Sequence, residues 1–203
     1  MLASHYKVMS FFNIPVNYHN IDRINHGIWM NRVMTQATSD VVVFFEPDCI
    51  PLSIDYIKCV RYAGKNNTFV GIAQVSNHIP PKSHIYAAPG FYAISTKAYD
   101  ELGRPSFAET YRSDVGEEIC YLAEERGLKY QALLPTHFEK PSSEGVWRLG
   151  CISSYGIGTV FGGLVYHLYQ SRMAENIELF TQRCQDVIDQ RFTTSGMNSS
   201  FIF

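Results

Sequence analysis

The stretch VVVFFEPDCIPL, residues 41–52, joins a run of five apolar residues to two acids. The run Val41–Phe45 is typical of a strand that is buried on both faces, and such strands belong to the interior of a sheet. Glu46 and Asp48 follow it, and the apolar pattern resumes at Ile50. Because ligands bind outside the carboxyl ends of strands in open α/β sheets, this step predicts a functional site. The alternative is a solvent-exposed turn that begins with two acids.

Helix-like and strand-like segments alternate on both sides of this stretch. We expect helices over the ranges 3–12, 25–38, 53–64, 96–103, 113–126 and 173–191. We expect strands over the ranges 14–21, 41–45, 68–76, 90–95, 129–135 and 164–172. The connections are expected to be a loop over 78–90, a long loop or lid over 141–163 and a loose tail over 192–203. This alternation predicts an α/β fold with a largely parallel sheet.

The composition limits the class of protein. The chain has 203 residues, of which 46% are hydrophobic and 18% charged, and it suits one globular domain over residues 1–203. The net charge of -2 gives no reason to expect a nucleic-acid partner. No apolar run reaches the ~20 residues of a membrane span and no secretory signal is visible, so we expect a cytoplasmic protein. Five scattered cysteines without a CxxC pair predict reduced thiols.

Two carboxylates one residue apart can converge on one hard cation. Mg²⁺ and Mn²⁺ prefer oxygen ligands, and they keep positions for water and for substrate phosphates. A divalent ion held by Glu46 and Asp48 would neutralise a diphosphate leaving group. The two acids therefore predict a metal site.

Four segments carry a resemblance to a known family. NHGIWMNRVMTQATSDVVVFFEPDCIPL (25–52) resembles the N-x-G and strand-D-x-D segments of nucleotide-sugar-dependent glycosyltransferases with the GT-A fold, family 2 in particular. GFYAIS (90–95) resembles their acceptor-side strand, SDVGEEICYLAEERG (113–127) an acidic helix that ends in Gly, and VYHLYQSR (165–172) a closing segment with a further metal contact. The resemblance covers about residues 1–172 and implies a GT-A fold, a Rossmann-like sandwich with a mostly parallel central sheet.

The resemblance implies an enzyme and its metal ligands. The enzyme would be a hexosyl- or deoxyhexosyltransferase that moves a sugar from a nucleotide-diphosphate donor to a hydroxyl of a glycan, protein or small molecule. Asp48 matches the last Asp of D-x-D and would be the principal ligand of Mn²⁺ or Mg²⁺. Glu46 takes the place of the first Asp and would bind the metal, its water or the ribose. His167 would be a further ligand, although a lone His on an apolar segment can also be a core residue.

An acidic helix supplies the expected catalytic base. Asp114 is our candidate for the general base, and its presence favours an inverting transfer. Glu117 and Glu118 are competitors one turn further along. Acids in the first turn of a helix are also ordinary partners of the helix dipole, so this alternative stays open.

Further contacts to the donor are expected from five residues: Asn25, His26, Gly27, Arg148 and Arg172. The resemblance puts the first three near the nucleotide or its phosphates, and helix capping is the alternative. The two arginines would add positive charge against phosphate. Trp147 and the run 156–159 would belong to the lid.

The resemblance is incomplete at the start of the chain. GT-A enzymes place a strand and a base-gripping loop before the helix that 3–12 resembles, and neither is visible here. One alternative is therefore a catalytically inactive GT-A-like domain that binds a sugar or a partner. Another is a nucleotidyltransferase, which would carry a Gly-rich phosphate loop with Lys or Arg near its start. The sequence shows no such loop.

Overall fold

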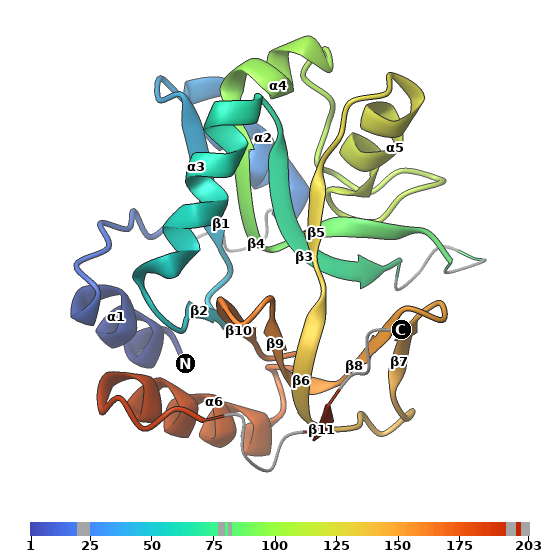
Figure 1. Ribbon diagram of the computed structural model, residues 1–203. Helices are drawn as coiled ribbons and strands as arrows, with labels where there is room; N and C mark the ends of the chain where they lie inside the picture. Colours follow the sequence, from blue (N-terminus) through green and yellow to red (C-terminus); the bar gives the residue numbers. More distant parts are fainter. Residues whose placement is uncertain (20–24, 77–79, 81–82, 194–197, 200–203) are drawn as a thin grey trace. The chain divides into compact units, whose positions relative to one another are not determined.

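The computed structural model describes residues 1–19, 25–76, 80, 83–193 and 198–199 (Figure 1). The chain divides into two compact units. Unit 1 comprises Met1–Asn17, Phe45–Tyr56 and Leu134–Phe203, and unit 2 comprises Tyr18–Phe44 and Ile57–Leu133. Among the described residues, no helix combines the length and the apolar character needed to cross a membrane.

Unit 1 is built on a five-stranded antiparallel sheet. The strand order is β11 (Asn198–Ser199), β6 (Pro135–Lys140), β9 (Ile157–Phe161), β10 (Val165–His167) and β2 (Cys49–Pro51). The other elements are α1 (Leu2–Phe11), η1 (Ile54–Tyr56), the hairpin of β7 (Trp147–Leu149) and β8 (Ser153–Tyr155), and α6 (Ala174–Ile188). Helices α1 and α6 lie side by side (Figure 1).

The core of unit 1 fixes the strand that follows the two acids. Helix α6 buries Phe180, Cys184 and Val187, which recur at helical spacing on one face. These side chains share a cluster with Val8 of α1 and Ile50 of β2, both fully buried. Because burying one such side chain contributes roughly 1.5–3 kcal/mol, this cluster holds β2 firmly in the sheet.

Unit 2 is built on a four-stranded mixed sheet. The strand order is β1 (Val41–Phe45), β4 (Ile85–Ser95), β3 (Phe69–Val75) and β5 (Gln131–Leu133). Its helices are α2 (His26–Gln36), α3 (Ile57–Asn66), α4 (Thr96–Glu101) and α5 (Glu117–Glu125). Helices α2 and α3 lie on opposite faces of the sheet (Figure 1).

The predicted fold class is wrong. A GT-A-type sandwich needs a mostly parallel central sheet, but both main sheets are small and mostly antiparallel. Strands β3 and β5 are the only parallel pair among those whose register the structure describes. The reason lies in the segment 78–90, which was expected to be a loop throughout. Strand β4 already begins at Ile85, so only a short connection separates it from the end of β3 at Val75. A parallel pair needs a crossover of about a dozen residues or more, and the connection 76–84 is too short for one.

Strand β1 occupies a different position from the one expected. It was predicted inside the sheet but lies at one end of the four described strands. Its residues alternate between buried and half-buried. Phe44 packs edge-on against Trp29 of α2 at 5.8 Å, and Val41 lies so close to α3 that a Cβ on Gly64 would meet it at 3.0 Å. The residues of β1 are therefore apolar because α2 packs on one face of the strand and α3 on the other.

Three further segments differ from expectation. Residues 14–19 form no strand, since Pro15 cannot donate to a ladder, and the rest of the expected strand lies outside the described residues. The expected lid 141–163 contains β7, β8 and β9. The expected loose tail contributes β11, which pairs with β6, while 194–197 and 200–203 lie outside the described residues.

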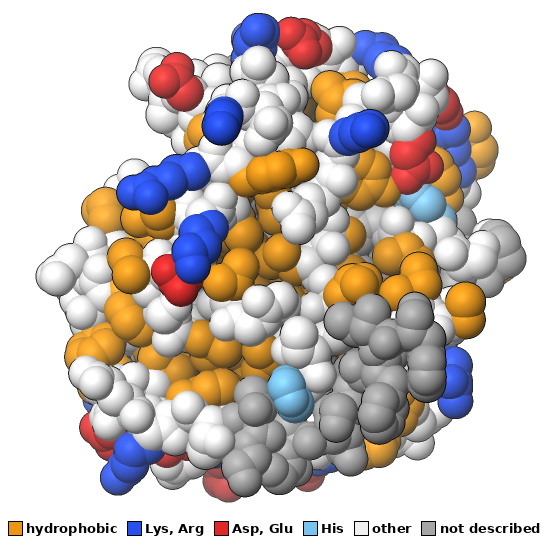
Figure 2. All heavy atoms as spheres, in the orientation of Figure 1, with side chains coloured by type: hydrophobic (Ala, Val, Ile, Leu, Met, Phe, Trp, Pro, Cys, Tyr) orange, Lys and Arg blue, Asp and Glu red, His pale blue; other side chains and the backbone are white. Residues whose placement is uncertain are grey.

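Several local predictions are confirmed. Helices α1, α2 and α6 and strands β1 and β3 lie within the expected ranges or within two residues of them. All five cysteines are free thiols, and Cys151 alone of them is exposed. Lys and Arg side chains lie at several separate places on the face that Figure 2 shows, in keeping with the small net charge.

Candidate metal centre

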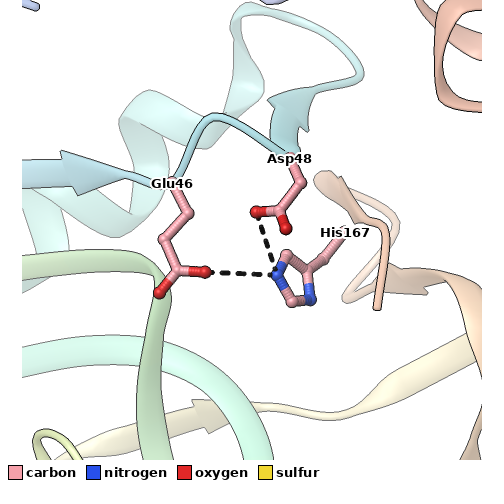
Figure 3. A group of neighbouring side chains, drawn as sticks. All are labelled: Glu46, Asp48 and His167. Atoms are coloured by element: carbon pink, nitrogen blue, oxygen red, sulfur yellow. Dashed lines mark ion pairs between the residues drawn. The ribbon is translucent and has the colours of Figure 1, made fainter. Parts of the chain in front are cut away.

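Glu46 and Asp48 lie on a tight turn that leads into β2. The backbone N–H of Cys49 donates to the carbonyl oxygen of Glu46 at 2.9 Å, which closes a four-residue turn. Pro47 holds the second position, where its fixed φ favours the turn. Figure 3 shows that both carboxylates point toward the ring of His167. The turn thus explains why the chain places two acids one residue apart.

Pairing between β2 and β10 brings His167 to the same place. The two strands are antiparallel, and Cys49 is the direct partner of His167. Beyond this pair, the N–H of Leu168 donates to the carbonyl oxygen of Asp48 at 2.9 Å. The backbone of Asp48 and that of His167 are therefore held by one ladder within unit 1.

The three side chains converge at distances longer than hydrogen bonds. The Nε2 atom of His167 lies 3.5 Å from Glu46 Oε2 and 3.5 Å from Asp48 Oδ1. One ligand atom from each residue lies within 4.8 Å of the others. Asp48 Oδ1 and both ring nitrogens of His167 are buried and have no hydrogen-bond partner among the described residues. Since buried polar atoms are nearly always paired, this set of atoms suits a bound cation.

The donor set fits a divalent metal ion. Neighbouring ligands around Mg²⁺ or a similar ion lie ~3 Å apart when each bond is ~2.1 Å, so separations of 3.5 Å need only a small contraction. Carboxylates suit Mg²⁺ and Mn²⁺, and an imidazole is a ligand of transition metals. The combination of Glu46, Asp48 and His167 therefore favours Mn²⁺ over Mg²⁺.

The electrostatics of the site couple Asp48 to His167. Burial raises the pKa of Asp48, but the positive charge of His167 and a hydrogen bond from the Ser171 side chain bring it below its usual range. Burial lowers the pKa of His167, but the negative charges of Asp48 and Glu46 raise it to about 9. Without metal the ring is therefore a cation at neutral pH, and a metal ion would take the place of its proton.

Two supporting residues were missed in the sequence. Ser171 hydrogen-bonds Asp48 from the turn that follows β10, and no local pattern in the sequence points to this contact. His5 of α1 is buried and hydrogen-bonds the backbone of Cys49, while burial lowers its pKa to about 4. No sequence pattern connects His5 to a turn more than forty residues away.

Asp114 and Glu117 belong to unit 2 and lie where α5 begins. The expected helix 113–126 starts only at Glu117, because Gly116 before it has a left-handed φ of +78°. The Glu117 carboxylate accepts from the Asp114 N–H at 2.7 Å, and Asp114 Oδ1 accepts from the Val115 N–H at 2.8 Å. Asp114 therefore lies in the turn before the helix.

Glu117 is also part of a closed network that the sequence did not indicate. His84 Nδ1 lies 2.8 Å from Glu117 Oε1, and His84 Nε2 lies 3.1 Å from Glu124 Oε1. The ring stacks on Tyr121 at 4.0 Å, and Tyr130 donates to Glu124 at 2.6 Å. Burial lowers the pKa of His84, but the two carboxylates outweigh it and raise the pKa above its ordinary value.

The expected donor contacts are spread over both units. In unit 2, Asn25 caps α2, since its side chain accepts from the N–H groups of Gly27 and Ile28. A Cβ on Gly27 would come within 2.5 Å of the backbone of Ala108, so this glycine permits a close approach. His26 is the first residue of α2 and stacks on Trp29 at 6.5 Å.

The two arginines lie in unit 1, and both are exposed. Arg148 is on β7, and Arg172 follows β10 by a few residues. Their predicted role as phosphate contacts stays a prediction.

Comparisons with known proteins give no further assignment. No protein-family model matches the sequence, and no curated protein matches it. The case for a function therefore depends on the chemistry of the Glu46–Asp48–His167 site and on the short segments that resemble glycosyltransferases.

Proposed function

We propose that the protein is a metal-dependent glycosyltransferase that moves a sugar from a nucleotide-diphosphate donor to an acceptor hydroxyl. The observation that carries the proposal is the convergence of Glu46, Asp48 and His167. Two carboxylates and one imidazole leave coordination positions for water and for phosphate oxygens, which suits a diphosphate substrate. The D-x-D-like step and the closing segment with its His add support from the sequence.

The residues of unit 1 prepare this site for a charged donor. Glu46, Asp48 and His167 would hold Mn²⁺ or Mg²⁺, and the bound ion would offset negative charge on the diphosphate as it leaves. Ser171 orients the Asp48 carboxylate, and the N–H of Leu168 holds the Asp48 backbone. The ligands are thus positioned by the fold before any donor arrives, which lowers the cost of binding. Asp114 stays our candidate for the base of an inverting transfer.

Asp48→Asn tests the proposal directly. We expect the native protein to be stabilised by UDP or GDP sugars only when Mn²⁺ is present, by ~2.7 kcal/mol at 100 times the dissociation constant. Asp48→Asn should lose this stabilisation and all transfer activity, because it removes the charge of a central ligand. Thermal unfolding and release of nucleotide diphosphate are the measurements. Glu144→Gln, an exposed acid of the same unit, is the matched control.

The alternatives give different results in the same assays. A catalytically inactive binding module would bind a sugar nucleotide with Mn²⁺ but release no nucleotide diphosphate with any acceptor. A nucleotidyltransferase would release pyrophosphate from a nucleoside triphosphate. If Asp48→Asn kept the native response to Mn²⁺ and sugar nucleotide, the proposed site would be wrong.

A further inference from the structure

An aromatic cluster adjoins the proposed metal ligand His167. Tyr169 follows it by two residues, and the rings meet edge to face with centroids 4.3 Å apart and planes at 87°. The Tyr169 ring also contacts Trp147 of β7 and Tyr155 of β8, each at 5.2 Å. All four residues belong to unit 1. A continuous series of rings therefore leads from the metal ligand to the β7–β8 hairpin.

Burial divides this cluster into an inner and an outer half. Tyr155 and its neighbour Phe161 are 1% and 0% exposed and belong to the core. Trp147 and Tyr169 are only half-buried, although both pack against the core cluster. The outer pair thus presents aromatic surface that a ligand can reach, and this surface begins at the ring that touches His167.

The chemistry of a donor bound at the ion explains such a surface. The diphosphate is charged and would lie at the ion, whereas the sugar is bonded directly to the outer phosphate. A sugar ring has apolar C–H faces, and aromatic side chains are the usual partners for such faces in ligand sites. The nucleobase is separated from the inner phosphate by the ribose and so lies further from the ion.

We propose that Trp147 and Tyr169 form the wall against which the sugar ring of the donor packs. This inference rests on the proposed function and deepens it, because it assigns the part of the site that recognises the sugar. A merely structural role for the pair would stabilise unit 1 or orient His167, and it would affect a nucleotide diphosphate and its sugar derivative equally. The difference between these two ligands is therefore the informative quantity.

Matched ligand pairs separate the contribution of the sugar. We would measure binding of UDP and UDP-glucose, and of GDP and GDP-mannose, in saturating Mn²⁺ by calorimetry. Trp147→Ala should weaken the sugar nucleotide that binds the native protein by about tenfold, as loss of a stacking aromatic side chain does, and leave its nucleotide diphosphate unchanged. Trp147→Phe should restore most of the affinity. If Trp147→Ala weakened the binding of both ligands equally, or of neither, the proposed sugar-binding role of Trp147 and Tyr169 would be wrong. The proposed function would not be affected.

A second measurement needs no variant at Trp147. The chain has two tryptophans, so Trp29→Phe leaves Trp147 as the only one. With Mn²⁺ present, the sugar nucleotide should change the emission of Trp147 more than its nucleotide diphosphate does. Identical spectra for the two bound ligands would overturn the wall. If neither ligand of either pair binds the native protein with Mn²⁺, the proposed function fails, and the wall fails with it.

Discussion

Each unit of the molecule sets one histidine against two carboxylates, but the two clusters are built differently. In unit 2, each ring nitrogen of His84 has its own carboxylate, at 2.8 Å from Glu117 and 3.1 Å from Glu124. In unit 1, the single Nε2 atom of His167 faces both Glu46 and Asp48 at 3.5 Å. The first arrangement satisfies the groups that it contains, whereas the second leaves buried nitrogen and oxygen atoms without hydrogen bonds among the described residues.

The difference shows that residue types alone do not identify a candidate metal site. Both clusters consist of one His and two acids, and in both the carboxylates raise the pKa of the ring above its ordinary value. What separates them is whether ligand atoms converge on one point or pair off in different directions. Atoms that converge on one point form a possible ligand set, in which a metal ion would take the place of the proton on His167, whereas atoms that pair off in different directions offer no such point.

The largest expected effect is on metal affinity. His167→Gln should weaken Mn²⁺ binding about 100-fold or more, since it removes the imidazole from a set of three ligands. His84→Gln should leave the affinity unchanged, because the pair of hydrogen bonds in unit 2 offers no point of convergence. Calorimetric titration of both variants with Mn²⁺ at one pH measures this. Equal losses in the two variants would remove the distinction between the clusters.

A smaller effect is expected on stability without metal. Glu117→Gln should lower the free energy of unfolding by about 2 kcal/mol, because a buried, charged acceptor is lost from His84 and from the Asp114 N–H. Glu46→Gln should lower it by less than about 1 kcal/mol, since Glu46 is partly exposed and its contact with His167 is long. Urea unfolding of the metal-free proteins gives both values. A larger loss for Glu46→Gln would contradict the comparison.

The smallest expected effect is a pH dependence in unit 2. The pKa of His84 is raised on folding, so its contribution to stability is complete below its ordinary value of 6.5 and is lost as the pH rises through the raised value. The stability difference between the native protein and His84→Gln should therefore be constant well below pH 6.5 and shrink as the pH rises above it. Subtraction of the two curves cancels the titration of His167, which both proteins share. A difference that stays constant with pH would show that folding leaves the pKa of His84 unchanged.

Local patterns in the sequence located much of the chain correctly, but pairing between distant segments could not be read from them. The helical spacing of Phe180, Cys184 and Val187 predicts α6, and the acids after β1 predict the turn at Glu46 and Asp48. Whether β3 and β4 pair parallel or antiparallel depends on the length of the connection between them. Hydrophobic periodicity does not indicate where that connection ends and β4 begins. The alternation of predicted elements therefore suggested a parallel sheet, and this was wrong.

The candidate site also has a part that local patterns in the sequence indicate and a part that only the strand pairing reveals. Glu46 and Asp48 stand out because acids follow an apolar strand, whereas His167 was expected only through the resemblance of its segment. The distances that make the three a possible ligand set come from the β2–β10 pairing, which no local pattern encodes. His84 immediately precedes β4 and Glu117 begins α5, so no local pattern in the sequence indicates their ion pair.

The pairing of Cys49 with His167 has a consequence for folding. Side chains alternate between the two faces of a strand, so a slip of one residue between β2 and β10 would turn the imidazole away from the acids. An ion that needs all three ligands would then bind only chains with the correct alignment. Metal present during folding would thereby favour the native register of β2 and β10 over registers shifted by one residue.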